Sequence, residues 1–169
     1  MKQDKRKQQN DIMNNPLRYS HYDIVMQEVP NEITLAIDIT GCPYRCPGCH
    51  SQFLWDYFGN ILKEDIDSII SKYKDYITCV CFMGGDQNMD DLEYLCRVVK
   101  QYHLKTCIYT GSKNQYKFLH FLHLIDYLKI GPYDSFYGGL DKETTNQVFY
   151  KIENGKFIDI TYLFQIKRY

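Results

Sequence analysis

The sequence has no long apolar run and no excess of charge of one sign. No stretch approaches the roughly 18 to 20 apolar residues that a helix needs to cross a bilayer. The 20 basic and 21 acidic residues leave a formal net charge of −1 at pH 7. Nucleic acids and anionic membrane surfaces select for clusters of positive charge. We therefore expect neither a nucleic-acid partner nor a membrane partner.

The N-terminal segment also lacks an apolar core. Residues 1–15 are polar and charged, which argues against a secretory signal peptide and is typical of a solvated tail. The remaining residues contain no linker, repeat or low-complexity tract, and they suffice for one hydrophobic core. We expect a flexible N-terminal tail over 1–15 and a single domain over 16–169.

The sequence contains seven cysteines, and we expect no secretory signal peptide. Disulfide frameworks belong to oxidising compartments, so a protein without a leader is expected to keep its thiols reduced. The sequence therefore predicts a cytoplasmic protein in which clustered cysteines bind metal or take part in chemistry.

Short β-branched segments alternate with segments of helical periodicity, a pattern typical of the α/β class with mostly parallel strands. Strands are expected over 33–41, 77–85, 104–111 and 126–133, and helices over 63–73, 88–103 and 114–124. Residues 147–166 read as a C-terminal hairpin around the turn "ENGK". Four motifs, the cysteine loop, "GGD", "YTG" and "GPYD", each follow a strand, so they should meet at one edge of the sheet.

The cysteine loop "TGCPYRCPGCHSQFLWD" places Cys42, Cys46 and Cys49 within eight positions and supplies no fourth cysteine. Structural zinc needs four ligands, and His50 directly follows Cys49, where it cannot easily complete a tetrahedron. An iron–sulfur cluster fits better, because one short loop can supply several thiolates. A three-thiolate cluster leaves one iron open for a ligand. A zinc site with three thiolates and a water stays open as an alternative.

Cys-x3-Cys-x2-Cys after a first strand resembles the radical S-adenosylmethionine enzymes. The resemblance implies that Cys42, Cys46 and Cys49 hold one 4Fe-4S cluster, whose open iron chelates S-adenosylmethionine and whose electron cleaves it to a 5′-deoxyadenosyl radical. It also implies a truncated (β/α) partial TIM-like barrel. The pattern alone leaves open whether the sheet curls in this way.

The resemblance continues in "FMGGDQ" at the end of the second expected strand. Gly84, Gly85 and Asp86 match the element that holds the methionine ammonium group. The aromatic residue that many members carry before the last cysteine is replaced by Gly48. The adenine contact is then expected from the backbone between Gly48 and His50, including Cys49, or from the His50 ring.

Within that superfamily the chain is similar to the anaerobic ribonucleoside-triphosphate reductase activating proteins, in "CPGC", "DYLKIGPY" and "TTNQVFY". This resemblance implies an activase that generates a glycyl radical on the reductase, its protein substrate, with an electron from a flavodoxin- or ferredoxin-type donor. Such hydrogen abstraction needs no acid–base pair, so no catalytic residue is expected beyond the cluster ligands. The alternatives are an activator of another glycyl-radical enzyme, a small-molecule radical enzyme, or a non-catalytic zinc or iron–sulfur interaction module.

Four further residues on the expected strands carry weaker signals. Cys79 and Cys81 flank one residue and should share a sheet face, where core packing is the simpler interpretation. Asp126 and Lys129 are three apart on the last parallel strand, so at most one of them can face a site.

Overall fold

The computed structural model describes residues 15–166 and confirms the α/β class. The tail expected over 1–15 lies outside the described residues except at Asn15. Helices and strands follow in this order: β1 (Arg18–Val25), β2 (Thr34–Ile39), η1 (Gln52–Trp55), β3 (Asn60–Ile61), α2 (Leu62–Tyr73), β4 (Cys79–Met83), α3 (Met89–Gln101), β5 (Lys105–Tyr109), η2 (Gln115–Leu124), β6 (Tyr127–Ile130), β7 (Val148–Glu153), β8 (Lys156–Asp159) and α4 (Tyr162–Gln165).

All strands belong to one eight-stranded sheet of order β3-β1-β2-β4-β5-β6-β7-β8. The four central strands β2, β4, β5 and β6 are parallel, whereas the strands on both sides of them pair antiparallel. The sheet is open, with β3 and β8 at its edges, so the expected partial barrel is a mixed sheet that does not close.

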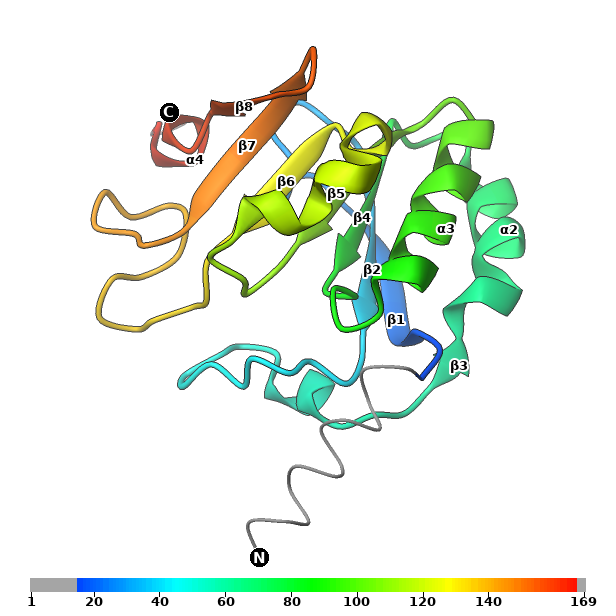
Figure 1. Cartoon of the computed structure of the whole chain (residues 1–169), viewed down its shortest axis with the longest axis horizontal. Coiled ribbons are helices and arrows are strands. Elements are labelled where there is room, and N and C mark those ends of the chain that lie inside the picture. The colour runs from blue at the N-terminus through cyan, green and yellow to red at the C-terminus, as the bar shows by residue number, and fades with distance from the viewer. Residues whose placement is uncertain (1–14, 167–169) are drawn as a thin grey trace, which may run out of the picture.

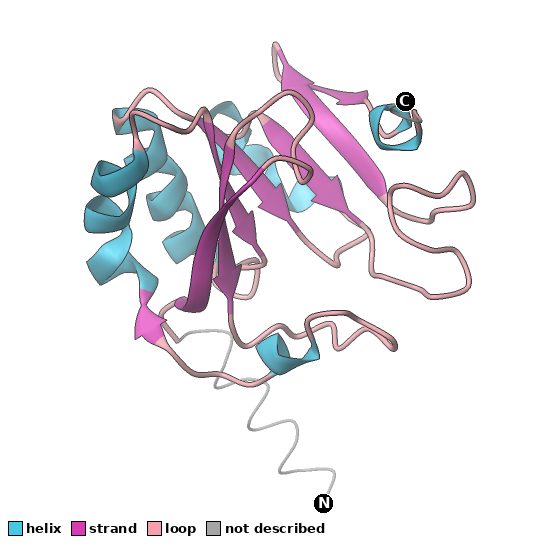
Figure 2. Ribbon diagram, turned by 180° about the vertical axis from the view of Figure 1, so that it is seen from behind, coloured by secondary structure: helices cyan, strands magenta, loops and turns pink. Residues whose placement is uncertain are grey.

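The parallel strands follow one another in space as they do in sequence, and their connections place α2, α3 and η2 on one face of the sheet (Figure 1). Right-handed crossovers between consecutive parallel strands put every connecting helix on the same side. The view from behind shows the strands in front of these helices (Figure 2). The cysteine loop and the loop after β6 lie together at the carboxyl ends of the parallel strands (Figure 1).

The expected helices and strands differ from the observed ones in three places. The helix expected over 114–124 is present as Gln115–Leu124, but it is a 3-10 helix with a kink at Phe121. The second strand of the hairpin stops at Asp159 and is followed by the short helix α4. The antiparallel strand β1 and its two-residue neighbour β3 were not expected at all. β1 begins two residues after Pro16, and its tyrosines, Tyr19 and Tyr22, are three positions apart, so its sequence lacks the regular alternation of a strand.

Strand alternation builds the main core between the sheet and its helices. Ile37, Phe82, Ile108 and Leu128 occupy one register across β2, β4, β5 and β6. All four are fully buried in a cluster that includes apolar side chains of α2 and α3. The helix α3 begins where its sequence predicts, with the Asn88 side chain accepting a hydrogen bond from the Asp91 N–H.

The opposite face carries a second, smaller core. Cys79, Cys81 and Cys107 are fully buried there with Tyr127 and Phe149. Cys81 and Cys107 are register partners on adjacent strands. The expectation that Cys79 and Cys81 share a face and pack in a core is therefore confirmed. No helix within residues 15–166 combines the length and the apolar character needed to cross a membrane.

Glu32 lies on this face at the end of the sheet away from the cysteine loop. Its side chain is only 4% exposed and pairs with Lys105. The hydroxyl groups of Thr78 and Tyr127 donate to the same carboxylate at 2.6 and 2.7 Å. Burial raises the pKa of the Glu32 carboxyl, but hydrogen bonds from Lys105, Thr78 and Tyr127 outweigh it and hold the pKa below its ordinary value of 4.5.

This carboxylate predicts an acid-sensitive contribution to folding. A carboxyl whose pKa is lower in the folded state stabilises the fold above the unfolded-state pKa, and the contribution disappears as pH falls through the folded value. Between about pH 6 and pH 3 the free energy of unfolding, measured in urea, should therefore fall less in Glu32→Gln than in the parent. The exposed Glu64→Gln variant should follow the parent. Equal pH slopes for Glu32→Gln and the parent would contradict this role.

Candidate iron–sulfur and S-adenosylmethionine site

One cavity lies at the carboxyl ends of the parallel strands, with an empty volume of about 770 Å³ when open solvent is included. All four loops that follow these strands contribute to it, as the sequence predicted. They contribute Cys42, Tyr44, Cys46 and Cys49 from the first loop, Gly84 and Asp86 from the second, Thr110 and Gly111 from the third, and Gly131 and Tyr133 from the fourth.

The cavity wall on the sheet side is a single register row. Asp38, Met83, Tyr109 and Lys129 are partners across β2, β4, β5 and β6, and all four line the cavity. Each is displaced by one residue from a position of the main core, so alternation turns it to the other face. This row combines one carboxyl and one amine with an apolar middle.

Lys129 is the buried amine of this row. Its Nζ donates to the Gly131 carbonyl oxygen at 2.8 Å and lies 5.9 Å from the centre of the Tyr109 ring. Burial lowers the pKa of Lys129 to about 8, although the nearby cysteine thiols act in the opposite direction. Asp126 does not reach the cavity, because it pairs with Lys100 and accepts a hydrogen bond from the Thr106 N–H. The expectation that only one of the two strand residues faces a site is met by Lys129.

The cysteine loop is anchored where it leaves β2. The Cys42 N–H donates to the Leu54 carbonyl at 2.9 Å, and the Cys49 N–H donates to the Cys46 carbonyl at 3.1 Å. All three thiols line the cavity and none is in a disulfide. Burial raises the pKa of the Cys42 thiol above its ordinary value.

Within residues 15–166, no three His, Cys, Asp or Glu side chains gather closely enough to hold a single metal ion. A 4Fe-4S cluster sets a different requirement, because each thiolate binds a different iron atom. The three thiols therefore need to border a shared space, and they need not converge on a point. Cys42, Cys46 and Cys49 border the same cavity, so this donor set fits such a cluster.

Two residues of the "GGD" turn line the cavity, and the third packs against the core. Gly84 and Asp86 line the cavity, whereas Gly85 does not. A Cβ placed on Gly85 would lie 3.0 Å from Ile39 Cδ1 and 3.2 Å from Leu92 Cδ1. Gly84 and Gly85 both have positive φ angles, of 113° and 105°, which disfavour any other residue there. Gly84 thus forms part of the cavity wall, whereas Gly85 lets the core side chains pack closely beneath it.

Asp86 is already engaged by protein groups. Its side chain is 2% exposed and pairs with Lys117 at 2.7 Å. Thr110 Oγ1 donates to the same oxygen at 2.8 Å, and so does the Tyr44 hydroxyl. Burial raises the pKa of Tyr44, and the Asp86 carboxylate raises it further, so this phenol keeps its proton and donates. The roles of Tyr44 and Lys117 were not indicated by any motif in the sequence.

Gly48 and His50 do not line the cavity. The His50 ring lies against Tyr133, with 5.5 Å between ring centres. Gly48 has a φ of 74°, and a Cβ there would lie 3.7 Å from Ser135 and Tyr133. Both residues join the cysteine loop to the loop after β6. The adenine contact expected from Gly48 and His50 therefore stays a prediction, while Trp55 is an aromatic side chain that does line the cavity.

Sequence reasoning also missed Asp38, Met83 and Tyr109. Alternation was a usable signal, because each of them lies at or next to the end of its strand on the face opposite the large apolar residues. Their common row depends on the strand registers, which the sequence does not contain.

Comparison with known proteins gives one family match and one curated relative. The family described as "4Fe-4S single cluster domain" matches residues 33–149. The 7-carboxy-7-deazaguanine synthase of Bacillus cereus is 30% identical over 112 residues, which are 62% of this chain and 45% of that protein. The chain thus spans less than half the length of this relative. No match to a solved structure was found.

The family match covers the first parallel strand, the cysteine loop, the "GGD" turn and all of the cavity-lining loops. Together with the relative, it supports a place in the radical S-adenosylmethionine superfamily. Over residues 33–149, the chain belongs to the 4Fe-4S single cluster domain family.

Proposed function

We propose that this protein is a radical S-adenosylmethionine activase that generates a glycyl radical on an anaerobic ribonucleoside-triphosphate reductase. The observation that carries the proposal is the meeting of three thiols, the Gly84–Asp86 turn and the buried amine of Lys129 in one cavity. A flavodoxin- or ferredoxin-type protein would supply the electron.

Each group at the cavity has a distinct task in this proposal. Cys42, Cys46 and Cys49 would hold the cluster, and the Gly84 backbone and Asp86 would receive the ammonium group of S-adenosylmethionine. Lys129 would pair with its carboxylate. When bound, the cluster and S-adenosylmethionine together supply a reducing electron and a 5′-deoxyadenosyl radical. Met83 and Tyr109 give the wall an apolar middle, which limits water beside the reacting carbons.

A protein substrate is supported by the loop after β6. Phe136 is 83% exposed and packs edge-on against Tyr137, with 5.0 Å between ring centres. The turn beneath the pair is well defined, since Asp134 accepts hydrogen bonds from the N–H groups of Phe136 and Gly138 at 2.9 Å. Ser135 lies beside Gly48 of the cysteine loop. Exposed aromatic side chains on an ordered turn are typical anchors for a partner protein.

A second candidate function is a radical enzyme acting on a small molecule. It is favoured by the 30% identity to a 7-carboxy-7-deazaguanine synthase over 112 residues. The exposed aromatic pair beside the cavity favours the activase, because a small substrate has no use for an anchor outside the cavity.

The deciding experiment is anaerobic. The reconstituted and dithionite-reduced protein receives S-adenosylmethionine, with and without an anaerobic ribonucleotide reductase, and 5′-deoxyadenosine is measured. Electron paramagnetic resonance of the reductase reports a glycyl radical. 5′-Deoxyadenosine together with a reductase-dependent glycyl radical supports the activase. 5′-Deoxyadenosine without the radical moves the function to another substrate, and a reduced cluster without cleavage rejects the enzyme.

Lys129 gives a separate prediction about ligand binding. Lys129→Met keeps the length of the side chain and removes its charge, so the affinity for S-adenosylmethionine should fall about 10- to 100-fold, the value of a hydrogen bond to a charged group. Iron and sulfide per chain should stay at the parent level. Titration calorimetry on the anaerobic protein measures the affinity. Unchanged affinity would remove Lys129 from the binding site.

A further inference from the structure

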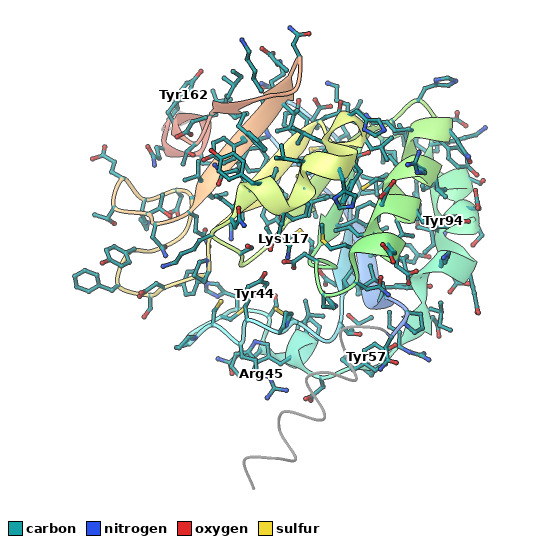
Figure 3. All side chains as sticks on the ribbon, viewed as in Figure 1. Tyr44, Arg45, Tyr57, Tyr94, Lys117 and Tyr162 are labelled. Carbon is teal, nitrogen blue, oxygen red and sulfur yellow. The ribbon has the colours of Figure 1, made fainter. Side chains whose placement is uncertain are left out.

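The cysteine loop is attached to the rest of the cavity through very few polar contacts. Within the described chain, Tyr44 makes the only hydrogen bonds that join residues 43–50 to the other loops at the strand ends. The hydroxyl of Tyr44 donates to Asp86, and Thr110 Oγ1 lies 3.4 Å from it. In Figure 3, Tyr44 on the cysteine loop lies near Lys117 on η2.

The three partners of Asp86 all reach the same oxygen. Tyr44, Thr110 and Lys117 each donate to Oδ2, and Lys117 Nζ also reaches the Asp86 carbonyl at 3.3 Å. Over residues 15–166, Oδ1 accepts no hydrogen bond from a protein group. One oxygen is thus committed to the protein, and the other is available to a ligand.

The ring of Tyr44 is held by shape as well as by its hydroxyl. It lies directly on Gly111, where a Cβ would come within 2.5 Å of Tyr44 Cγ and 2.7 Å of Cδ2. Real Cβ atoms do not approach a ring carbon so closely, so any side chain at 111 would displace the ring. Because φ of Gly111 is not positive, this glycine is required for space and not for backbone conformation.

The backbone of Arg45, the residue after Tyr44, also indicates that the loop is held in place here. Arg45 is exposed and has a φ of 46°, in the left-handed region that disfavours non-glycine residues. Such a conformation persists where the surrounding structure fixes it. On one side of Arg45 that constraint is the bonded and packed side chain of Tyr44.

We propose that Tyr44, Asp86, Thr110 and Lys117 form a clasp that positions the three thiols of the cysteine loop over the cavity. In this clasp Asp86 Oδ2 is a positioning group for the loop, while Oδ1 remains for a ligand. The clasp positions the thiols even in the iron-free chain. It rests on the proposed function only for the identity of the group that the thiols bind.

The test compares Tyr44→Phe with Tyr57→Phe. Tyr44→Phe removes the hydroxyl and leaves the ring on Gly111. Tyr57 follows the same loop and donates its hydroxyl to the Pro16 carbonyl at 2.7 Å, so Tyr57→Phe is a matched loss of one phenol hydrogen bond (Figure 3). The first readout is the rate at which iodoacetamide modifies Cys42, Cys46 and Cys49 in the iron-free, reduced chain, resolved by peptide mass spectrometry.

Tyr44→Phe should speed this modification roughly tenfold, the effect of one lost hydrogen bond to a charged group. Tyr57→Phe should match the parent, and the urea midpoints of both variants should be similar. In the reconstituted protein, Tyr44→Phe should also lose iron to a chelator roughly tenfold faster. Gly111→Ala, which displaces the ring, should give a larger increase in both rates.

Equal modification rates in Tyr44→Phe and Tyr57→Phe would overturn the clasp. If the parent assembles no cluster at all, the proposed function fails, and the modification rates of the iron-free chain still decide the clasp. The two failures are therefore distinguishable.

Discussion

Replacing Cys46 with alanine is expected to leave the protein folded and to abolish its iron–sulfur content. Cys46 is the central thiol of the triad and lines the cavity. With one of three thiolates missing, no other described cysteine can take its place, because Cys79, Cys81, Cys96 and Cys107 are all buried in the two cores.

The expected loss of 5′-deoxyadenosine formation is at least roughly a hundredfold, because changes to residues that merely support metal ligands already cost about 10- to 100-fold. Iron and sulfide analysis after anaerobic reconstitution checks the content, and chromatography of 5′-deoxyadenosine checks the activity. The control is Cys96→Ala, which removes a fully buried thiol of α3. It should cost about 1 kcal/mol of stability and keep the cluster. A Cys46→Ala protein with the parent's iron and sulfide would refute the ligand assignment.

The second large effect concerns the fold beneath the site. Phe82 is the residue before the end of β4, is fully buried and is among the largest side chains of the main core. Phe82→Ala should lower the free energy of unfolding by about 3–5 kcal/mol, through lost burial and the cavity that remains. Since whole domains have only about 5–15 kcal/mol, this is a large share of the total. Urea denaturation followed by circular dichroism measures it.

Phe136→Ala is the matched control for this loss. It removes the same ring from a position that is 83% exposed, so the unfolding free energy should change by no more than about 0.5 kcal/mol. Under the proposed function the same variant should weaken the interaction with the reductase. A loss of several kcal/mol in Phe136→Ala, or none in Phe82→Ala, would contradict the core described above.

The central part of the fold could be predicted because its signals are local. The four parallel strands are short apolar segments, and α2 and α3 show helical periodicity with acidic first turns. η2 was predicted only as a helix, because its apolar residues suit an α-helix or a 3-10 helix and the kink at Phe121 depends on packing. β1 was missed because its residues do not alternate regularly and its pairing with β2 is a contact that the sequence does not show.

The candidate site, like the fold, could be predicted from the sequence only in part. The crowding of Cys42, Cys46 and Cys49 and the position of "GGD" after a strand were visible in the sequence, and they led to the radical S-adenosylmethionine superfamily, which the comparisons support. The role of Gly85 was not visible, because a glycine required for packing against Ile39 and Leu92 looks the same as one facing a ligand.

The sequence by itself determined the α/β class, the positions of the four parallel strands along the chain and the crowding of three thiols in one loop. Each of these depends on residues that are neighbours along the chain. The tertiary structure decided that the sheet stays open, that Asp38, Met83, Tyr109 and Lys129 form one row, and that Asp86 binds Tyr44 and Lys117. The first two depend on strand register. The third depends on contacts that form only once the chain has packed, because Tyr44 is 42 positions from Asp86 in the sequence and Lys117 is 31 positions from it.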